Sequence, residues 1–81
     1  MPDYIFTTHA RDMLKERNIL EQWVLQTING PDEKDFGTDG NTHYYRSLVE
    51  RESRTLHVVV NETITPNRIV TLFLDRRRRT K

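Results

Sequence analysis

The sequence predicts an α+β domain in which an N-terminal helical hairpin packs on one face of a three- to four-stranded antiparallel sheet. Two observations support this fold class. Apolar residues recur at helical spacing as far as Asn29, and after Pro31 the spacing changes to the alternation that is typical of strands. Packing the hairpin on one sheet face is the arrangement that hides both apolar surfaces. A chain of 81 residues makes one domain, which we place at residues 1–75, followed by a basic tail at residues 76–81.

Two short helices are expected in the first 30 residues. The first covers residues 8–17, with Thr7 or Thr8 as its N-cap, because a hydroxyl there can accept a hydrogen bond from a free backbone N–H. The second runs from about residue 20 to residue 29, and Gly30 and Pro31 end it. The apolar stripes of the two helices consist of Phe6, Ala10, Met13 and Leu14, with Arg17, and of Leu20, Trp23, Val24 and Ile28. We expect Trp23 to lie in the core.

The rest of the chain predicts strands. A weak strand at residues 34–37 leads into a turn at residues 38–41, where Asp, Gly and Asn tolerate positive φ. Further strands are expected at residues 42–50, 55–61 and 68–75, and the last of these is the most apolar, so we place it centrally.

One face of this sheet should remain open. His57, Thr71 and Phe73 alternate onto that face in the last two strands. Either Tyr45 or the pair Tyr44 and Arg46 joins them, because the run from residue 44 to residue 49 does not reveal its inward side and a one-residue change of register exchanges the two sets.

Composition excludes several classes of protein. With 35% hydrophobic and 31% charged residues, the chain suits a folded domain, and the absence of cysteine excludes disulfides and thiolate chemistry. The three histidines match no metal-ligand spacing, so we expect no metal and no cofactor. No segment approaches the roughly 18 apolar residues of a membrane span, and the first residues lack the features of a signal peptide. We therefore expect a cytoplasmic protein without a membrane partner.

The net charge of +1 hides an asymmetry along the chain. Residues 1–75 carry eight basic and twelve acidic side chains, whereas the tail carries five cations, which are Arg76, Arg77, Arg78, Arg79 and Lys81. Such a run is either a solvated terminus or a contact for phosphate backbones or an acidic protein segment.

Five segments of the chain resemble a known family: FTTHARDMLKERNI, EQWVLQTINGPD, THYYRSL, LHVVV and IVTLFL. They are similar to a family of small bacterial domains of unknown function. That family opens with a Phe-Thr-x-His-Ala helix, has an Arg-x-Ile step into a second helix and ends with a strand of the Val-Ile-Thr type. The order of the elements also resembles the RelE, BrnT and barnase-like metal-independent ribonucleases, many of which are toxins of toxin–antitoxin pairs.

This resemblance implies an endoribonuclease with RNA as its substrate and an antitoxin protein as its partner. It assigns His9 to the family histidine, Arg17 to the arginine that closes the first helix, Arg46 to the arginine of the second strand and Thr71 to the threonine of the last strand.

The same residue types satisfy the chemistry of RNA cleavage without metal. Such cleavage needs a base for the 2′-hydroxyl, cations for the charge on phosphorus and an acid for the leaving oxygen. His9 or His57 can act as base or acid, because imidazole titrates near neutral pH. Arg17 and Arg46 can hold phosphate oxygens, and Tyr44 or Tyr45 can stack on a base or donate a proton. The tail arginines are further candidates for RNA contacts.

Each candidate also has an ordinary structural explanation. His9 can cap the first helix, Arg17 can pair with Glu21, and Arg46 can face Glu50. His57, the tyrosines and Thr71 can simply be sheet residues.

Two other classes of function remain open. One is a non-catalytic module that binds nucleic acid or protein, and the other is a homodimer or larger homo-oligomer that uses the open sheet face. A cleft in which His9, Arg17 and Arg46 converge would favour the enzyme.

Overall fold

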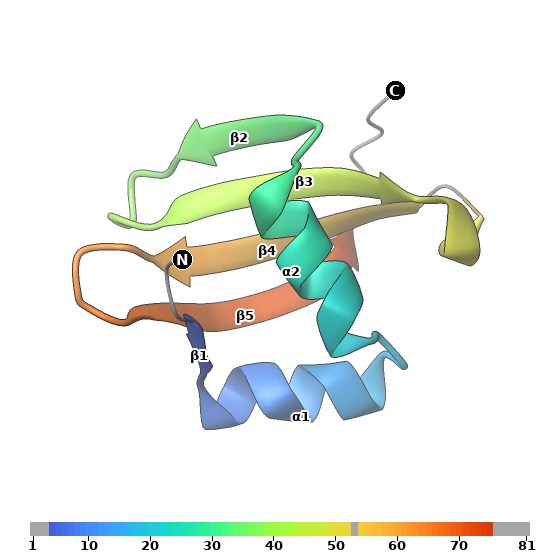
Figure 1. The fold of residues 1–81 in the computed structure, drawn as a ribbon, viewed down its shortest axis with the longest axis horizontal. Helices are drawn as coiled ribbons and strands as arrows, with labels where there is room; N and C mark the ends of the chain where they lie inside the picture. The colour runs from blue at the N-terminus through green and yellow to red at the C-terminus, as the bar shows by residue number, and fades with distance from the viewer. Residues whose placement is uncertain (1–3, 53, 76–81) are drawn as a thin grey trace.

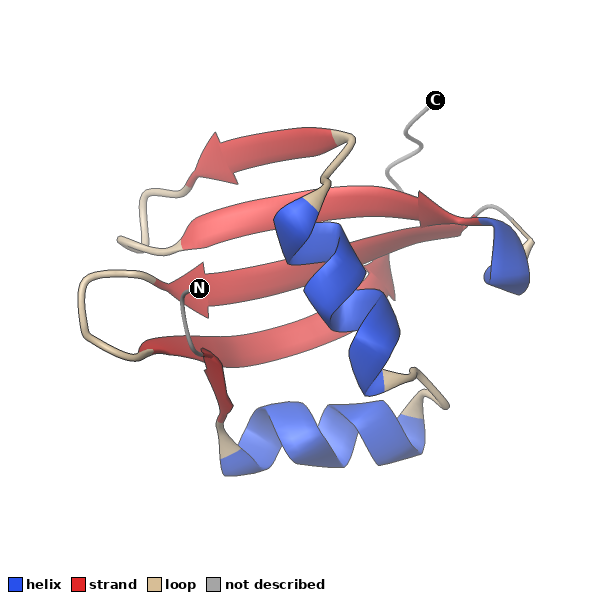
Figure 2. Ribbon diagram, in the orientation of Figure 1, coloured by secondary structure: helices blue, strands red, loops and turns tan. Residues whose placement is uncertain are grey.

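The computed structural model describes residues 4–52 and 54–75, and within them the chain forms a five-stranded mixed sheet with two helices on one face (Figures 1 and 2). The elements in chain order are β1 (Tyr4–Phe6), α1 (Thr8–Glu16), α2 (Glu21–Asn29), β2 (Glu33–Phe36), β3 (Thr42–Leu48), the 3-10 helix η1 (Val49–Arg51), β4 (Arg54–Asn61) and β5 (Asn67–Asp75). The predicted α+β class is confirmed. The basic tail at residues 76–81 lies outside the described residues.

The sheet order is β1-β5-β4-β3-β2, and the strands from β2 to β5 pair in antiparallel fashion as predicted. The structure adds β1, which pairs parallel to the first three residues of β5. β5, the strand predicted to be central, is an interior strand flanked by β1 and β4, although the middle strand of the five is β4. β1 covers only the start of β5, and α1, which follows β1 in the chain, runs alongside β5 (Figure 1).

Local chemistry explains where α1 begins and ends. Thr7 is the N-cap, since its hydroxyl oxygen accepts a hydrogen bond from the N–H of Ala10 at 3.1 Å. The same hydroxyl donates to the carbonyl of Val70 at 3.0 Å, which ties the start of α1 to β5. At the other end Asn18 adopts φ 53°, a left-handed conformation that asparagine tolerates, and the chain turns into α2.

The core lies between the helices and one face of the sheet. It contains most of the predicted helical positions, which are Phe6, Ala10, Met13, Trp23, Val24 and Ile28, with Leu14 packed against them. The prediction is wrong for Arg17 and Leu20, which are exposed, and Ile19 is buried instead. From the sheet it takes Tyr44 and Leu48 of β3, alternate residues of β4, and Ile69 and Leu72 of β5. No helix in the described part of the chain is long and apolar enough to span a membrane.

The register of β3 settles the choice that the sequence left open. Tyr44 lies in the core, and Arg46 points to the same side, where it reaches the end of α2. Tyr45 therefore faces the opposite side, which we call the helix-free face, together with His57, Thr71 and Phe73.

Candidate functional site

The helix-free face brings together side chains from the three longest strands. Their pairing forms three rows across β3, β4 and β5: His43, Val59 and Thr71; Tyr45, His57 and Phe73; and Ser47, Thr55 and Asp75. Two of the three histidines of the chain therefore lie on this face, at diagonal positions of neighbouring strands. His57 occupies the middle of the pattern and is buried.

His57 contacts a ring or a charged group on each side. Its ring centroid lies 4.3 Å from that of Tyr45 and 4.7 Å from that of Phe73. Its Nε2 lies 2.7 Å from Nδ1 of His43, and its Nδ1 lies 3.5 Å from Oδ2 of Asp75. Neighbouring aromatic rings and two polar contacts thus fix the orientation of this imidazole.

His43 continues the line of contacts toward the β2–β3 turn. Its Nε2 lies 3.2 and 3.3 Å from the two carboxylate oxygens of Asp39. The N–H of Asn41, followed by the His43 ring, holds the pKa of Asp39 below its usual value. His43 is only partly buried, so its ring remains accessible from solvent.

The resulting chain of contacts runs Asp39–His43–His57–Asp75, and we call it the carboxylate–histidine chain. Three gaps separate its four members, and each gap is bridged best by one proton. Two neutral imidazoles carry one N–H group each, so the tautomers of His43 and His57 decide which of the three gaps carries a hydrogen bond.

His9 approaches the same face from its β5 side. It lies in the first turn of α1 with its side chain exposed, and its Nε2 is 3.1 Å from the hydroxyl of Thr71. His9 and Thr71, both predicted from the sequence, are therefore in contact. Val59 lies between Thr71 and His43 in the same row, so His9 and His43 flank it from opposite sides.

The predicted cations lie elsewhere. Arg46 is on the helix-covered face, where its Nη1 donates to the carbonyls of Gln26 at 3.3 Å and Gly30 at 3.0 Å. Arg17, the C-cap of α1, lines a pocket at the other end of that helix from His9. The structure therefore brings His9 to Thr71. Arg46 lies at the C-terminal end of α2 and Arg17 at the C-terminal end of α1, so these two arginines do not join His9 in one cleft.

The remaining predicted residues divide between the two faces. Tyr44 is in the core, and its hydroxyl donates to Oε2 of Glu62, whereas Tyr45 lies beside His57. Burial, followed by the hydrogen bond to Glu62, raises the pKa of Tyr44 far above its usual value. Arg76, Arg77, Arg78 and Arg79 lie outside the described residues.

Sequence reasoning missed His43, Asp39 and Asp75. A signal for His43 was present, because its spacing of two from Tyr45 puts both on one face of a strand. In the sequence Asp39 is recognisable only as a turn residue, because its approach to His43 depends on the exact geometry of the turn. In residues 4–52 and 54–75, no three side chains of the His, Asp or Glu type are grouped to hold a metal ion.

A comparison with known families matches residues 6–74 to the model of a domain of unknown function, DUF4258. No curated protein and no solved structure gives a significant match. The match extends from the end of β1 to the penultimate residue of β5 and includes His9, His43, His57 and Thr71. The chain therefore belongs to the DUF4258 family.

Proposed function

We propose that the protein is a metal-independent endoribonuclease of the RelE, BrnT and barnase-like kind, acting in the cytoplasm as the toxin of a toxin–antitoxin pair. The observation that carries the proposal is the placement of two accessible imidazoles, His9 and His43, on either side of Val59. Adjacent strands are about 4.8 Å apart, so the strand positions of Thr71 and His43 are separated by roughly 10 Å. Val59 itself is buried, so the phosphodiester would lie above this row, between the two imidazoles that flank it.

Two imidazoles on opposite sides of a phosphate supply both proton transfers of RNA cleavage. The base removes the proton of the 2′-hydroxyl, whose oxygen attacks phosphorus, and the acid protonates the departing 5′-oxygen. The products are a 2′,3′-cyclic phosphate and a free 5′-hydroxyl. One imidazole must be neutral and the other protonated at the start.

The surroundings of the two histidines support one assignment of these roles. His9 is exposed, and its described side-chain partner is the hydroxyl of Thr71, so we assign it the base, with Thr71 orienting the ring. We assign His43 the acid, because its ring lies between the carboxylate of Asp39 and the ring of His57, whose Nδ1 faces Asp75. His57 is buried and acts through His43 as a positioning residue.

Binding of a single strand is supported by aromatic side chains on the same face. Tyr45 and Phe73 flank His57, and aromatic rings on a sheet are the usual platform for unpaired bases. Tyr45 is buried, so the partly exposed Phe73 is the ring that a base can reach. The acidic side chains Asp39 and Asp75 lie on the β3 side and at the far end of β5, so we expect the RNA backbone to follow the α1 side of the sheet.

Cleavage of a labelled single-stranded RNA in the presence of EDTA tests the enzyme. His9→Ala and His43→Ala should each slow cleavage by roughly 10² to 10⁴-fold, the usual contribution of a general acid or base. Arg68→Ala, which removes an exposed cation that forms no hydrogen bond or ion pair with either histidine among the described residues, is the matched control. Wild-type protein freed of its partner that leaves RNA intact, or equal rates for wild type and His9→Ala, would refute the proposal.

The outer edge of β2 favours a second candidate function, a subunit that pairs with another chain. β2 is the edge strand of the sheet opposite β1, and its Phe36 is 74% exposed. A second copy or an antitoxin strand can add to this edge. Sedimentation at several protein concentrations separates a homodimer from a monomer, and Phe36→Ser should abolish a dimer formed there.

A further inference from the structure

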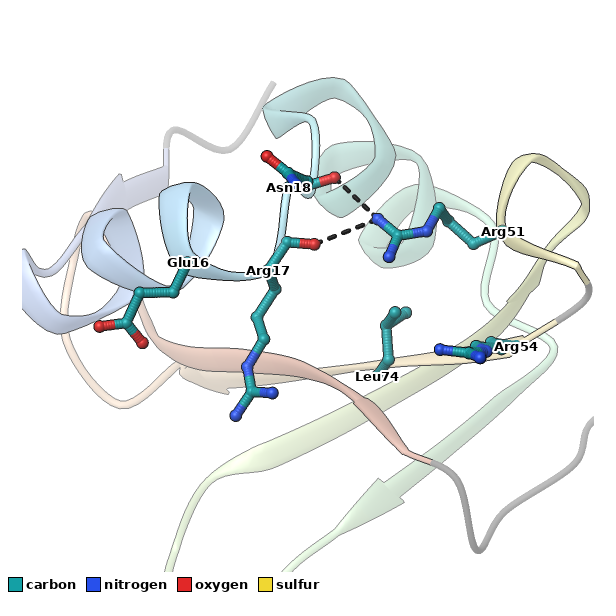
Figure 3. Close-up of a pocket in the computed structure, with 6 residues that line it drawn as sticks. All are labelled: Glu16, Arg17, Asn18, Arg51, Arg54 and Leu74. Atoms are coloured by element: carbon teal, nitrogen blue, oxygen red, sulfur yellow. Dashed lines mark hydrogen bonds between the residues drawn. The ribbon is translucent and has the colours of Figure 1, made fainter.

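A small pocket opens at the end of the sheet where α1 stops. It has a volume of about 230 Å³ and lies between the C-terminus of α1, η1 and the facing ends of β4 and β5 (Figure 3). Its lining consists of Glu16, Arg17, Asn18, Arg51, Arg54 and Leu74. Half of these residues are arginines, although the described chain as a whole is rich in acidic residues.

Arg51 is held in place by the end of α1. Its Nη1 donates to the carbonyl of Arg17 at 3.1 Å and to that of Asn18 at 2.9 Å. These are carbonyls that a helix end leaves without partners, so the guanidinium satisfies them and keeps a fixed orientation. The remaining N–H groups of Arg51 stay available on the side of the pocket (Figure 3).

Among the side chains that the structure describes, no ion pair neutralises the arginines of this pocket. None of Arg17, Arg51 and Arg54 forms an ion pair with a carboxylate whose side chain the structure describes. Glu16 also lines the pocket, but in Figure 3 its carboxylate points away from the three guanidinium groups. Arg17 and Arg54 are exposed, so an anion can reach them from solvent.

We propose that this pocket binds a phosphate group, and that the phosphate belongs to the RNA strand bound for cleavage, an assignment that rests on the proposed function. Guanidinium groups bind phosphate oxygens in pairs of parallel hydrogen bonds, and three arginines line this space. The volume is below the roughly 300 Å³ at which sites for whole small molecules begin, so it suits a phosphate better than a nucleoside.

The position of the pocket along α1 determines which phosphate it takes. His9 and Arg17 are eight residues apart on α1, which corresponds to a rise of about 12 Å. The pocket is therefore too far from His9 to hold the phosphate that is cut. It holds a neighbouring phosphate of the same strand and sets the register of the RNA over the two histidines.

Binding of inorganic phosphate tests the pocket without reference to RNA. The side-chain Nε–H signals of the arginines are followed by NMR while phosphate is added to the full-length protein. We expect the signals of Arg17, Arg51 and Arg54 to shift together with one dissociation constant, and that of Arg68 to stay in place. Equal small shifts of all arginines would show a general salt effect and overturn the site.

A second measurement tests whether the phosphate comes from RNA. Binding of a 2′-O-methyl oligonucleotide, which cannot be cut, is compared for wild type, Arg17→Gln/Arg54→Gln and Arg68→Gln. The double variant should bind about tenfold or more weakly, and its slope of log K against log salt should fall by about 0.7, the value for one phosphate contact on a single strand. Glu16→Gln should bind more tightly than wild type, because it removes the one acidic side chain of the lining.

The outcomes separate the pocket from the enzyme. If the double variant loses oligonucleotide binding while wild type cuts no RNA, the phosphate site stands and the ribonuclease proposal fails. If the double variant binds the oligonucleotide as Arg68→Gln does but has lost inorganic phosphate, the pocket serves a free phosphate, and the assignment to RNA is overturned.

Discussion

Gly37 shows how one residue controls the geometry of the candidate site. A Cβ at this position would lie 2.6 Å from both Oδ1 of Asp39 and Nε2 of His43. Those atoms are in contact with each other, so a side chain at position 37 would displace the end of the carboxylate–histidine chain. Glycine is required here for the space that it leaves, and its backbone freedom is not used.

Gly37→Ala should therefore disturb His43 without unfolding the protein. Because the two obstructing atoms are at the ends of side chains, they can move, and we expect a change of less than about 1 kcal/mol in the free energy of unfolding. The ring signals of His43 should shift in the NMR spectrum, and RNA cleavage should slow. Thr38→Ala is the control, since residue 38 is an exposed turn residue. Unchanged His43 signals in Gly37→Ala would show that the ring does not depend on this space.

Thr7 links α1 to the sheet through one hydroxyl, which caps the helix and also donates to Val70. Thr7→Ala should lower the free energy of unfolding by about 1 to 2 kcal/mol, the usual cost of losing an N-cap. Thr8→Ala changes an exposed residue inside the helix and should have almost no effect. Urea denaturation of the two variants checks this, and equal losses would show that Thr7 is not the cap.

At the scale of elements, the sequence predicts most of this fold because local patterns are strong. The two helices, the turn at residues 38–41 and the alternating strands follow from spacing and from residue types with clear backbone preferences. β1 could not be predicted, because a strand of three residues is too short to show an alternating pattern and because it pairs with the start of β5, which is distant in the sequence. The site was predictable only in part for the same reason. The contact between His9 and Thr71 spans 62 positions, and that between His43 and His57 depends on the register of two strands.

Arg46, a residue of β3, stabilises the C-terminal end of α2. Its guanidinium donates to carbonyls at the C-terminal end of α2, where unpaired carbonyls and the helix dipole favour a cation. We infer that this residue stabilises α2 and takes no part in cleavage.

Arg46→Ala should therefore lower the free energy of unfolding by about 1 kcal/mol, the net value of a typical hydrogen bond at a partly exposed site. Arg46→Lys should recover part of this loss, because a cation remains near the helix end. Thermal unfolding measures the change, and Arg68→Ala serves as the exposed control. At a temperature where both proteins are folded, the rate of RNA cleavage should equal that of wild type, and a large loss of rate would restore Arg46 to the catalytic residues.

At the scale of the whole molecule, the two faces of one sheet carry different chemistry. The helix-covered face is an apolar core closed at its edge by Tyr44, Thr42 and the carboxylate of Glu62. The helix-free face carries the imidazoles and carboxylates. Strand alternation alone separates the two sets, so adjacent residues such as Tyr44 and Tyr45 have unrelated roles.

Tyr44, on the helix-covered face, makes the stability of the protein depend on pH in alkaline solution. Burial and the bond to Glu62 raise the pKa of Tyr44 above its usual value of 10.0, so above pH 10 the unfolded chain releases a proton that the folded protein keeps. The free energy of unfolding should then fall as pH rises, by about 1.4 kcal/mol for each pH unit from this residue.

Tyr44→Phe isolates this contribution, since phenylalanine fills the same place in the core and has no proton to release. At pH 7 the variant should be less stable than wild type by about 1.5 to 3 kcal/mol, because it loses a hydrogen bond to a charged carboxylate. Between pH 10 and pH 11.5 the difference in the free energy of unfolding between the two proteins should shrink steadily. Only wild type loses stability in this range, because its unfolded chain releases the Tyr44 proton that the folded protein retains. Urea denaturation of both proteins across this range gives the two curves. Curves that stay parallel above pH 10 would mean that Tyr44 titrates as it does in the unfolded chain, and that its bond to Glu62 does not close the edge of the core.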